Sequence, residues 1–376
     1  MRDLLEIREE IDQIDDQIVK LYEERMNLTS EVAEYKIGTG KQVFDKERED
    51  TKLRTLSAKA SCEFTKNGVR ELFEQIMAMS RKKQYQLLTQ HGIANETGFV
   101  PVDKLDCRNA RIVFQGLEGA YSQQAMEMFF GENCDNFHVA TWKDAMEAIR
   151  DGRADYAVLP IENSSAGIVS ENYDLLVEYD NYIVGEQIVR IDHALLGVPG
   201  AKESDITSVF SHKQSLMQCS DFLEQHAEWE RFSLSNNAVA AKKVMEDGLK
   251  NQAAIASAKN TEIYGLEVMC SSIQNNKNNS TRFIVVTGKK IYTEAARRIS
   301  ICFEVNHESG ALYHALSHFI YNGINMTNIQ SRPLQNKNWE YRFFVDFEGS
   351  FGEESVQNAL RGLKEETISL KILGTY

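Results

Sequence analysis

The sequence predicts a multidomain protein with an all-α region first, an α/β region in the middle and an α+β region last. Apolar residues in the first helix alternate at spacings of three and four, which is the seam of a coiled coil. From residue 111, short apolar runs alternate with helical stretches, as in α/β domains with mainly parallel strands. From residue 297, the expected elements follow in the order βαββαβ, a ferredoxin-like pattern.

Length and charge limit the possible partners. A chain of 376 residues is long enough for two or three domains, and its 42% apolar and 26% charged residues are ordinary for globular proteins. The net charge of -14 argues against nucleic acid or an anionic membrane as a partner. Anionic substrates would therefore need local Arg and Lys side chains to hold them.

The cysteines and the N-terminus favour a cytoplasmic protein. The cysteines are scattered without a Cys-x-x-Cys pair, which predicts free thiols and no metal site; they lie at positions 62, 107, 134, 219, 270 and 302. The first residues lack a basic-then-apolar signal, and no apolar run approaches the roughly 20 residues that span a bilayer. A Walker lysine and a GxGxxG loop are also missing, so we expect no nucleotide cofactor.

The first helix has an apolar seam that is too long for one small domain. From Asp3 to about Lys36 it would extend roughly 50 Å, so the seam should pack against a partner chain. Its members are Leu4, Ile7, Ile11, Ile14, Ile18, Leu21, Leu28, Val32 and Tyr35.

Arg25 interrupts this seam, and a buried cation is costly unless it is paired. It is either a register device or an anion site. Lys36 shares its face about 16 Å further along, so the two side chains could span a small dianion. Arg8 lies roughly 25 Å from Arg25. One metabolite cannot touch both from the same helix, so Arg8 would serve a site completed by the partner chain.

Two further helices add polar groups to this bundle. Asp45 is a good N-cap, and Glu49 lies one turn on along the same face. Ser80 and Gln84 continue an apolar stripe of the third helix. Each of these residues alone is more often a cap or part of a solvated face. Together, the candidates place three cations, two carboxylates and an amide around one bundle.

Residues 4–88 resemble the all-helical chorismate mutase domain. The matching pieces are Ile7-Arg8, Glu24-Arg25, Glu34-Tyr35-Lys36, Asp45-x-x-Arg48-Glu49 and Ser80-x-x-x-Gln84. The resemblance implies an intertwined homodimer, or a dimer of dimers, that binds chorismate through Arg8, Arg25, Lys36, Asp45, Arg48, Glu49, Ser80 and Gln84. In this family, Arg25 and the partner's Arg8 hold the two carboxylates, and Lys36 and Gln84 hydrogen-bond the ether oxygen of the breaking bond. Such a pericyclic reaction needs positioning and oriented donors, not a nucleophile or a metal.

Residues 91–110 lack a clear period and are interpreted as a linker. Beyond them, we expect strands at 111–114, 156–160, 208–210, 253–256 and 283–286, with helices at 122–130, 142–150, 214–225 and 238–246. Polar residues follow or precede several strands, where ligands of open α/β folds bind. Each such residue could instead be a simple helix cap or a strand entry. No Gly-x-Ser-x-Gly elbow is present to make His212 part of a triad.

This region resembles prephenate dehydratase along its full length. The motifs are Gly116-x-x-Gly119-x-Tyr121-Ser122, Leu159-Pro160-Ile161-Glu162-Asn163-Ser164, Ser211-His212 with Gln218-Cys219, and Asn279-x-Thr281-Arg282-Phe283. The resemblance implies two α/β subdomains, like those of periplasmic binding proteins, with a cleft that binds prephenate through Glu162, Asn163, Ser164, Ser211, Gln218, Thr281, Arg282 and Phe283. Thr281 would donate to the leaving hydroxyl and Arg282 would hold a carboxylate. The chain has Asn236-Asn237 where this family usually has Ser-Thr.

Residues 297–376 resemble ACT regulatory domains. The matching pieces are Gly310-Ala311-Leu312, Gly323-Ile324-Asn325-Met326-Thr327-x-Ile329 and Ser331-Arg332-Pro333. The family binds phenylalanine at a dimer interface, which implies effector binding by Gly310, Ala311, Leu312, Gln330, Ser331 and Arg332. Gln330 replaces the glutamate that usually precedes Ser-Arg-Pro.

Taken together, the resemblances predict a bifunctional chorismate mutase/prephenate dehydratase that phenylalanine regulates. The expected domains are residues 1–90 (mutase), 91–110 (linker), 111–290 (dehydratase) and 297–376 (regulatory). The rival hypothesis is a non-catalytic, dimeric protein that senses an amino acid. Lys36, Gln84 and Thr281 argue against it, because a sensor needs none of these catalytic groups.

Overall fold

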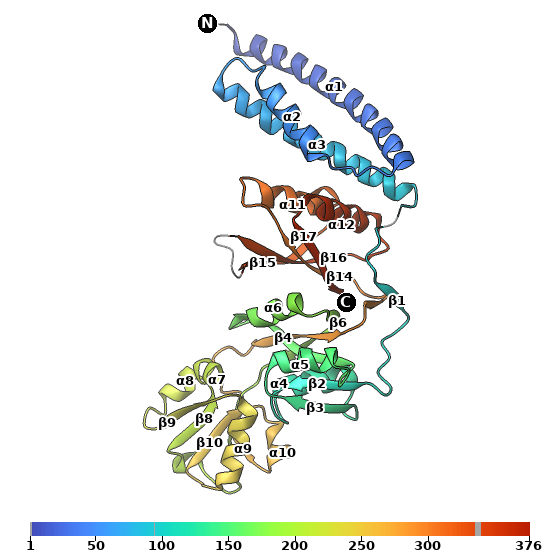
Figure 1. Ribbon diagram of the computed structural model, residues 1–376. Helices are drawn as coiled ribbons and strands as arrows, with labels where there is room; N and C mark the ends of the chain where they lie inside the picture. The colour runs from blue at the N-terminus through green and yellow to red at the C-terminus, as the bar shows by residue number, and fades with distance from the viewer. Residues whose placement is uncertain (1, 94, 335–339) are drawn as a thin grey trace. The chain divides into compact units, whose positions relative to one another are not determined.

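The computed structural model describes residues 2–93, 95–334 and 340–376 (Figure 1). The chain forms two compact units. The first consists of Met1–Thr97 with Arg297–Ile372, and the second consists of Gly98–Ala296 with Leu373–Tyr376. No helix among the described residues is both long enough and apolar enough to cross a bilayer.

The first unit begins with three helices, α1 (Leu4–Thr39), α2 (Lys46–Ser57) and α3 (Glu63–Gln90). Asp3 caps the start of α1, and Gly40 ends it in the left-handed conformation that glycine adopts without strain. Asp45 accepts the Arg48 N–H and caps α2, as the sequence indicates. The long first helix and the N-cap of the second were therefore both visible in the sequence.

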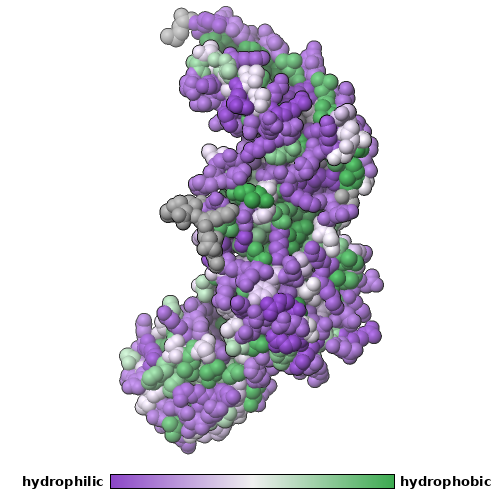
Figure 2. All heavy atoms as spheres, viewed as in Figure 1, coloured by the Kyte–Doolittle hydropathy of each residue, from purple (hydrophilic) through white to green (hydrophobic). Residues whose placement is uncertain are grey.

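Much of the α1 seam is exposed. Thr29 and Ala33 are buried, whereas Leu21 and Leu28 are 63% and 60% exposed. Figure 2 shows apolar side chains among the polar ones along this helix. Because a monomeric protein rarely leaves such a continuous apolar surface in water, the seam needs a covering element.

The rest of the first unit has the order βαββαβ. Its elements are β14 (Arg298–Glu304), α11 (Ala311–Tyr321), β15 (Met326–Pro333), β16 (Tyr341–Glu348), α12 (Glu354–Glu366) and β17 (Ser369–Thr375), whose last residues belong to the second unit. The strands lie in the order β15-β16-β14-β17. Val356, Leu360 and Leu363 of α12 are buried, and α3 packs against α11 and α12.

The second unit has two large sheets with helices between strands, besides a small two-stranded one. One sheet has the order β6-β12-β4-β2-β3, with β5 beside β4, and the other has the order β11-β7-β10-β8-β9. The strands are β2 (Arg111–Gln115), β3 (Asp135–Val139), β4 (Tyr156–Asn163), β5 (Gly167–Ile168), β6 (Tyr182–Arg190), β7 (Ala194–Gly197), β8 (Ser208–His212), β9 (Glu230–Leu234), β10 (Gln252–Ala256), β11 (Glu267–Cys270) and β12 (Ser280–Thr287). The helices are α4 (Tyr121–Phe130), α5 (Trp142–Arg150), α6 (Ser170–Glu178), α7 (Lys213–Gln218), α8 (Ser220–Glu224), α9 (Asn237–Asp247), α10 (Asn260–Tyr264) and the short η1 (Glu203–Asp205).

The expected parallel sheet is a mixed one. Strands β2, β3 and β4 are parallel, but β12 is antiparallel to both of its neighbours, β4 and β6. The reason is the path of the chain. It leaves the first sheet to build the second, and on its return enters between β4 and β6 from the opposite end. This reversal places the start of β12 beside the end of β4.

The expected linker contains a strand that sequence reasoning missed. Val100–Val102 (β1) pairs in parallel with Ile291–Thr293 (β13). Each strand has three residues, and β1 has a proline at its centre, so neither shows the alternation from which a strand is predicted.

Candidate active sites

The helical bundle brings Arg25, Ser80 and Gln84 together. Arg25 on α1 donates to the Ser80 hydroxyl and, at 3.4 Å, to the Ile76 carbonyl on α3. Gln84 donates to the Ser80 carbonyl at 3.2 Å, while its buried Oε1 has no partner among the described residues. Burial lowers the pKa of Arg25, against the attraction of Glu49. The cluster thus contains a partly desolvated cation, Arg25, and a side-chain oxygen without a described partner, Gln84 Oε1.

Lys36 lies at the other end of this face. Its Nζ donates to the Val43 carbonyl at 2.6 Å, in the segment that joins α1 to α2. Burial lowers its pKa, and the carboxylates of Glu365, Asp45 and Glu49 oppose that shift. The Lys36 ammonium group therefore lies within the electrostatic influence of several carboxylates.

The remaining mutase candidates are spread over α1 and α2. The Asp45 side chain serves as the N-cap of α2, Arg48 is exposed, and the Glu49 carboxylate contacts Arg81 of α3. Arg8 is exposed near the N-terminal end of α1. The distance estimate from the sequence already separated Arg8 from Arg25. Sequence reasoning missed Arg81, because one more charge on an amphipathic helix gives no sign of burial.

In the second unit, antiparallel pairing places Thr281 of β12 directly opposite Asn163 of β4. Asn163 Nδ2 donates to Thr281 Oγ1 at 2.8 Å. The orientation of this amide is set by Asn163 Oδ1, which accepts the backbone N–H groups of Ser165 and Ala166 at 3.0 and 2.8 Å. Because Thr281 accepts from Asn163, its own hydroxyl proton remains available to another acceptor.

A cavity of about 370 Å³ lies beside this pair and is lined from both sheets. Asn163, Gln218, Thr281 and Phe283 line it, together with Gln115, Ala120, Tyr121, Ser122, Trp142, Pro160, Ala166, Val169, Ile191, His193, His212, Gln214, Ser215, Ser235, Asn236 and Asn237. Thr281 is only 8% exposed. The cavity is large enough for a small metabolite, and amides and hydroxyls dominate its polar wall.

His193 is a wall residue that sequence reasoning missed. It is almost fully buried, with Nε2 at 3.0 Å from Gln218 Oε1 and Nδ1 at 3.1 Å from the Tyr121 hydroxyl. Burial lowers its pKa, so the imidazole is neutral at physiological pH. Burial also lowers the pKa of His212, which caps α7 by accepting the Gln214 N–H. The sequence contained no signal for His193 beyond the residue itself.

The two asparagines in place of Ser-Thr have separate roles. Asn236 caps α9 by accepting the Val239 N–H at 2.8 Å. Asn237 Oδ1 accepts from the Ser211 hydroxyl, the Ser215 hydroxyl and the His212 N–H at 3.2, 3.0 and 3.2 Å. One amide oxygen therefore holds together the ends of β8 and α7 at the cavity wall.

Four of the predicted prephenate residues do not line the cavity. Ser211 is buried and donates to the Ile255 carbonyl at 2.6 Å, and Ser164 bonds Asn279 and the Ser280 N–H. Arg282 lies 3.4 Å from Glu162 and 3.6 Å from Glu186. That Arg282 holds a substrate carboxylate stays a prediction, and in this structure its guanidinium lies beside these two glutamates. Side chains alternate along a strand, so Arg282 points away from the face of Thr281 and Phe283.

The predicted effector residues are divided between two elements. Ala311 and Leu312, at the start of α11, line a cavity of about 140 Å³ with Tyr341 and Phe343 of β16. Gly310 caps this helix with a left-handed backbone. Gln330, Ser331 and Arg332 lie on β15 and do not line that cavity; Gln330 donates to Asn328 at 3.2 Å.

The fold and the two sites define a chain with two distinct small-molecule sites, and comparison with known proteins identifies its family. The chorismate mutase type II model matches residues 7–85, and the prephenate dehydratase model matches residues 112–291. A bifunctional chorismate mutase/prephenate dehydratase from Aquifex aeolicus is 32% identical over 378 residues, which cover 100% of this chain and 98% of that relative. The chain therefore belongs to the bifunctional chorismate mutase/prephenate dehydratase family. It is an enzyme with an isomerase and a lyase activity, and the hypothesis of a non-catalytic sensor is set aside.

Solved structures match 71% of the chain. A prephenate dehydratase from Arthrobacter aurescens in complex with L-Phe has 28% identity and a TM-score of 0.66, covering 71% of this chain and 89% of its own. GqqA, a quorum quenching acylase, has 32% identity and a TM-score of 0.65, covering 71% of this chain and 97% of its own. Since this fold also occurs in an acylase, the roles of individual residues must come from the site itself.

Proposed function

We propose that the two activities use separate sites, the mutase reaction in the helical bundle and the dehydratase reaction in the cavity between the two sheets. One observation supports this most strongly: the groups suited to each reaction gather within a single unit. Arg25, Lys36 and Gln84 belong to the first unit, whereas Asn163 and Thr281 belong to the second.

In the bundle, Arg25 and Lys36 attract the dianionic chorismate and hold it in the compact conformer that reacts. During the rearrangement, the ether C–O bond breaks while a C–C bond forms, and negative charge develops on the oxygen. Lys36 and Gln84 donate to this oxygen, so they stabilise the transition state more than the bound substrate. Lys36 and Gln84 would exchange their present carbonyl acceptors, Val43 and Ser80, for the substrate.

The mutase site is completed by a second copy of the chain. The exposed α1 seam supports a homodimer, because pairing would cover its apolar residues. Arg8, far along the same helix, would then reach the partner's Arg25. The assembly could be a dimer or a dimer of dimers.

In the cavity, prephenate loses its ring carboxylate as carbon dioxide and its ring hydroxyl as hydroxide, which takes a proton from solvent and becomes water. The electrons of the C–COO⁻ bond move into the ring, which becomes aromatic as the C–OH bond breaks. Thr281 donates its available proton to the departing hydroxyl as a hydrogen bond that strengthens in the transition state. Asn163 fixes the orientation of Thr281 by donating to its oxygen. The product is phenylpyruvate.

The C-terminal βαββαβ region is proposed to be an ACT domain that binds phenylalanine, at a site that includes the N-terminus of α11. Helix N-termini attract carboxylates, and Leu312 offers apolar contact to a ring. The dehydratase relative from Arthrobacter aurescens was solved with L-Phe, which supports this assignment. The six free cysteines are in keeping with a cytoplasmic enzyme.

A mixed-dimer experiment tests the mutase site. Arg8→Met and Arg25→Met chains should each lose mutase turnover when they are prepared alone. If each site combines Arg25 of one chain with the partner's Arg8, co-expressed chains should recover roughly a quarter of wild-type turnover, since half of the random dimers contain one intact site. Dehydratase turnover serves as the internal measure of folded protein. Mixed chains that stay as inactive as the single variants would contradict a shared site.

A further inference from the structure

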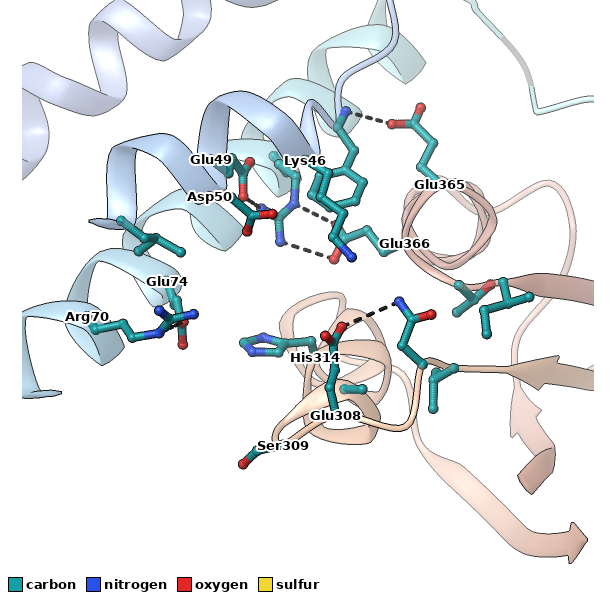
Figure 3. Close-up of a pocket in the computed structure, with 18 residues that line it drawn as sticks. Lys46, Glu49, Asp50, Arg70, Glu74, Glu308, Ser309, His314, Glu365 and Glu366 are labelled. Carbon is teal, nitrogen blue, oxygen red and sulfur yellow. Dashed lines mark hydrogen bonds and ion pairs between the residues drawn. The ribbon is translucent and has the colours of Figure 1, made fainter. Parts of the chain in front are cut away.

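Two adjacent carboxylates at the end of α12 face the mutase helices within the first unit (Figure 3). The side chains of Glu366 and of Arg81 on α3 are each 8% exposed. Glu366 accepts two hydrogen bonds from Arg81, from Nε at 2.7 Å and from Nη2 at 3.1 Å. The third guanidinium nitrogen of Arg81 donates to Glu49 of α2. One arginine therefore connects the C-terminal helix with a predicted mutase residue.

This connection is rigid. A guanidinium held through two nitrogens by one carboxylate has a fixed plane, and that plane fixes the direction of its third nitrogen. His318 Nε2 of α11 lies 3.3 Å from Glu366 Oε1, the oxygen that also accepts from Arg81 Nε. Burial opposes ionisation of Glu366, but His318 and Arg81 together hold its pKa at about 2. Glu366 is therefore ionised at every working pH and keeps Arg81 in place.

The neighbouring carboxylate holds two more segments of the mutase bundle. Glu365 accepts the Phe44 N–H at 2.9 Å and the Tyr85 hydroxyl at 3.1 Å. Phe44 follows Val43, whose carbonyl accepts from Lys36, and Tyr85 follows Gln84 on α3. The last turn of α12 thus contacts Tyr85, which is adjacent in sequence to Gln84, and Phe44, which is adjacent to the carbonyl acceptor of Lys36.

From this geometry we infer that Glu366 is a positioning residue for the mutase reaction, acting through Arg81 on the Glu49 carboxylate. The inference rests on the proposed assignment of Glu49 to the chorismate site. It means that mutase turnover depends on a side chain of the C-terminal region, more than 280 residues further along the chain. A merely structural contact would tie the helices together without affecting how Glu49 meets the substrate.

A double-mutant cycle on the full chain distinguishes these two roles. Glu366→Gln leaves Arg81 free to rotate together with Glu49. Misplacement of a group at an active site typically lowers the reaction rate by about 10–100-fold. We expect that fall in mutase kcat/KM with unchanged dehydratase turnover. Because Glu366 acts on the reaction only through Glu49, the double variant Glu49→Gln/Glu366→Gln should have the same mutase kcat/KM as Glu49→Gln alone. Glu354→Gln, the same change at an exposed position in the first turn of α12, is the matched control and should leave both rates unchanged.

Two results would overturn the inference. One is a Glu366→Gln chain that keeps mutase kcat/KM within about twofold of wild type, a change small beside the usual cost of misplacement. The other is a double variant whose losses multiply, which would show independent action. If Glu366→Gln alters the circular dichroism spectrum, the Arg81→Lys variant replaces it as the test of the inference. It keeps the buried cation but cannot bond both carboxylates in the same way, and it too should lower mutase kcat/KM without adding to Glu49→Gln.

Lys36→Ala separates failure of this inference from failure of the proposed function. If Lys36→Ala lowers mutase turnover while Glu366→Gln does not, only the role of Glu366 is wrong. If Lys36→Ala leaves mutase turnover intact, the proposed mutase site is wrong, and the role of Glu366 is wrong with it.

Discussion

The proposed mutase site in the bundle and the proposed dehydratase site in the cavity offer different kinds of groups to an anionic metabolite. In the bundle, the candidate groups are long charged side chains, and Arg25 and Lys36 are only partly buried. In the cavity, they are short neutral groups, and the Thr281 hydroxyl is held by the Asn163 amide. A pericyclic reaction is helped by charges around one conformer, whereas the departure of a hydroxyl needs one donor in a fixed place.

The two regions also differ in how their residues meet. The bundle residues Arg25, Ser80 and Gln84 come together through helical spacing and the packing of α1 on α3. The cavity residues come together through strand register, in which Thr281 is paired with Asn163. A charge in the bundle can move with its side chain, but a one-residue shift in register would turn Thr281 away from the cavity. We therefore expect the cavity to tolerate fewer changes.

The largest expected effect is that of Thr281→Val, which removes the hydroxyl and keeps the shape. Loss of one preorganised donor typically costs about 10²–10³ in kcat, so dehydratase turnover should fall by this factor while mutase turnover is unchanged. Steady-state rates with prephenate and with chorismate measure the two effects. Thr287→Val, the same change at a buried position at the other end of β12, is the control. Parallel loss of both activities in a folded chain would indicate one shared site.

Lys36→Ala should affect the mutase activity and spare the dehydratase activity. Mutase turnover should fall by about 10²–10³, because the developing charge on the ether oxygen loses its donor, and dehydratase turnover should stay the same. Lys20→Ala, at an exposed position of the same helix, should change neither rate. A Lys36→Ala chain within about threefold of wild-type mutase turnover, a small change by the same measure, would show that this assignment is wrong.

Asn237→Ala should have a smaller effect on the cavity than Thr281→Val. It removes the acceptor shared by Ser211, Ser215 and the His212 N–H. Ser211 keeps the Ile255 carbonyl as an acceptor, but the buried Ser215 hydroxyl loses its own. An unsatisfied buried donor costs about 1–3 kcal/mol, so the urea midpoint should fall and dehydratase turnover should fall with it. Asn236→Ala, which removes only a helix cap, should lower stability by about 1 kcal/mol with less effect on turnover. Equal loss of turnover in both variants would contradict a role for Asn237 at the cavity wall.

The smallest expected effect is a difference in pH dependence. Burial lowers the pKa of Lys36, so this group loses its charge at a lower pH than the usual value of about 10.4. Since the charged form assists the reaction, mutase kcat should decline on the alkaline side before an ordinary lysine would titrate. Comparison with Lys36→Arg, which keeps its charge, isolates this group. An alkaline decline that persists unchanged in Lys36→Arg would assign it to another residue.

Local patterns in the sequence predicted much of the helical region. The apolar seam predicted a helix from Asp3 to about Lys36, and α1 spans Leu4–Thr39. The sequence also placed Arg25, Ser80 and Gln84 around one helical bundle, and in the structure Arg25 and Gln84 both donate to Ser80. Asp45 was identified as a cap from its residue type alone. These successes share one cause, because helical periodicity and capping depend on neighbours within a turn or two.

Long-range contacts were beyond such patterns. The pairing of Arg81 with Glu366 joins residues from opposite ends of the chain, and no local signal distinguishes them from solvated charges. His193 was missed for the same reason. Arg282 points to the face opposite that of Thr281 for a local reason, because adjacent residues of a strand point to opposite faces. The antiparallel direction of β12 depends on the route of the chain through the second sheet, which a list of strands does not contain.

The most direct test of two successive sites in one chain is to supply chorismate alone and identify the products. Purified wild-type chain should convert chorismate to phenylpyruvate, with prephenate as a transient species in chromatography. The Thr281→Val chain should consume chorismate at the wild-type rate and accumulate prephenate. Unchanged chorismate with the wild-type chain, or phenylpyruvate formed at the wild-type rate by Thr281→Val, would contradict the proposed division of the reaction between the bundle and the cavity.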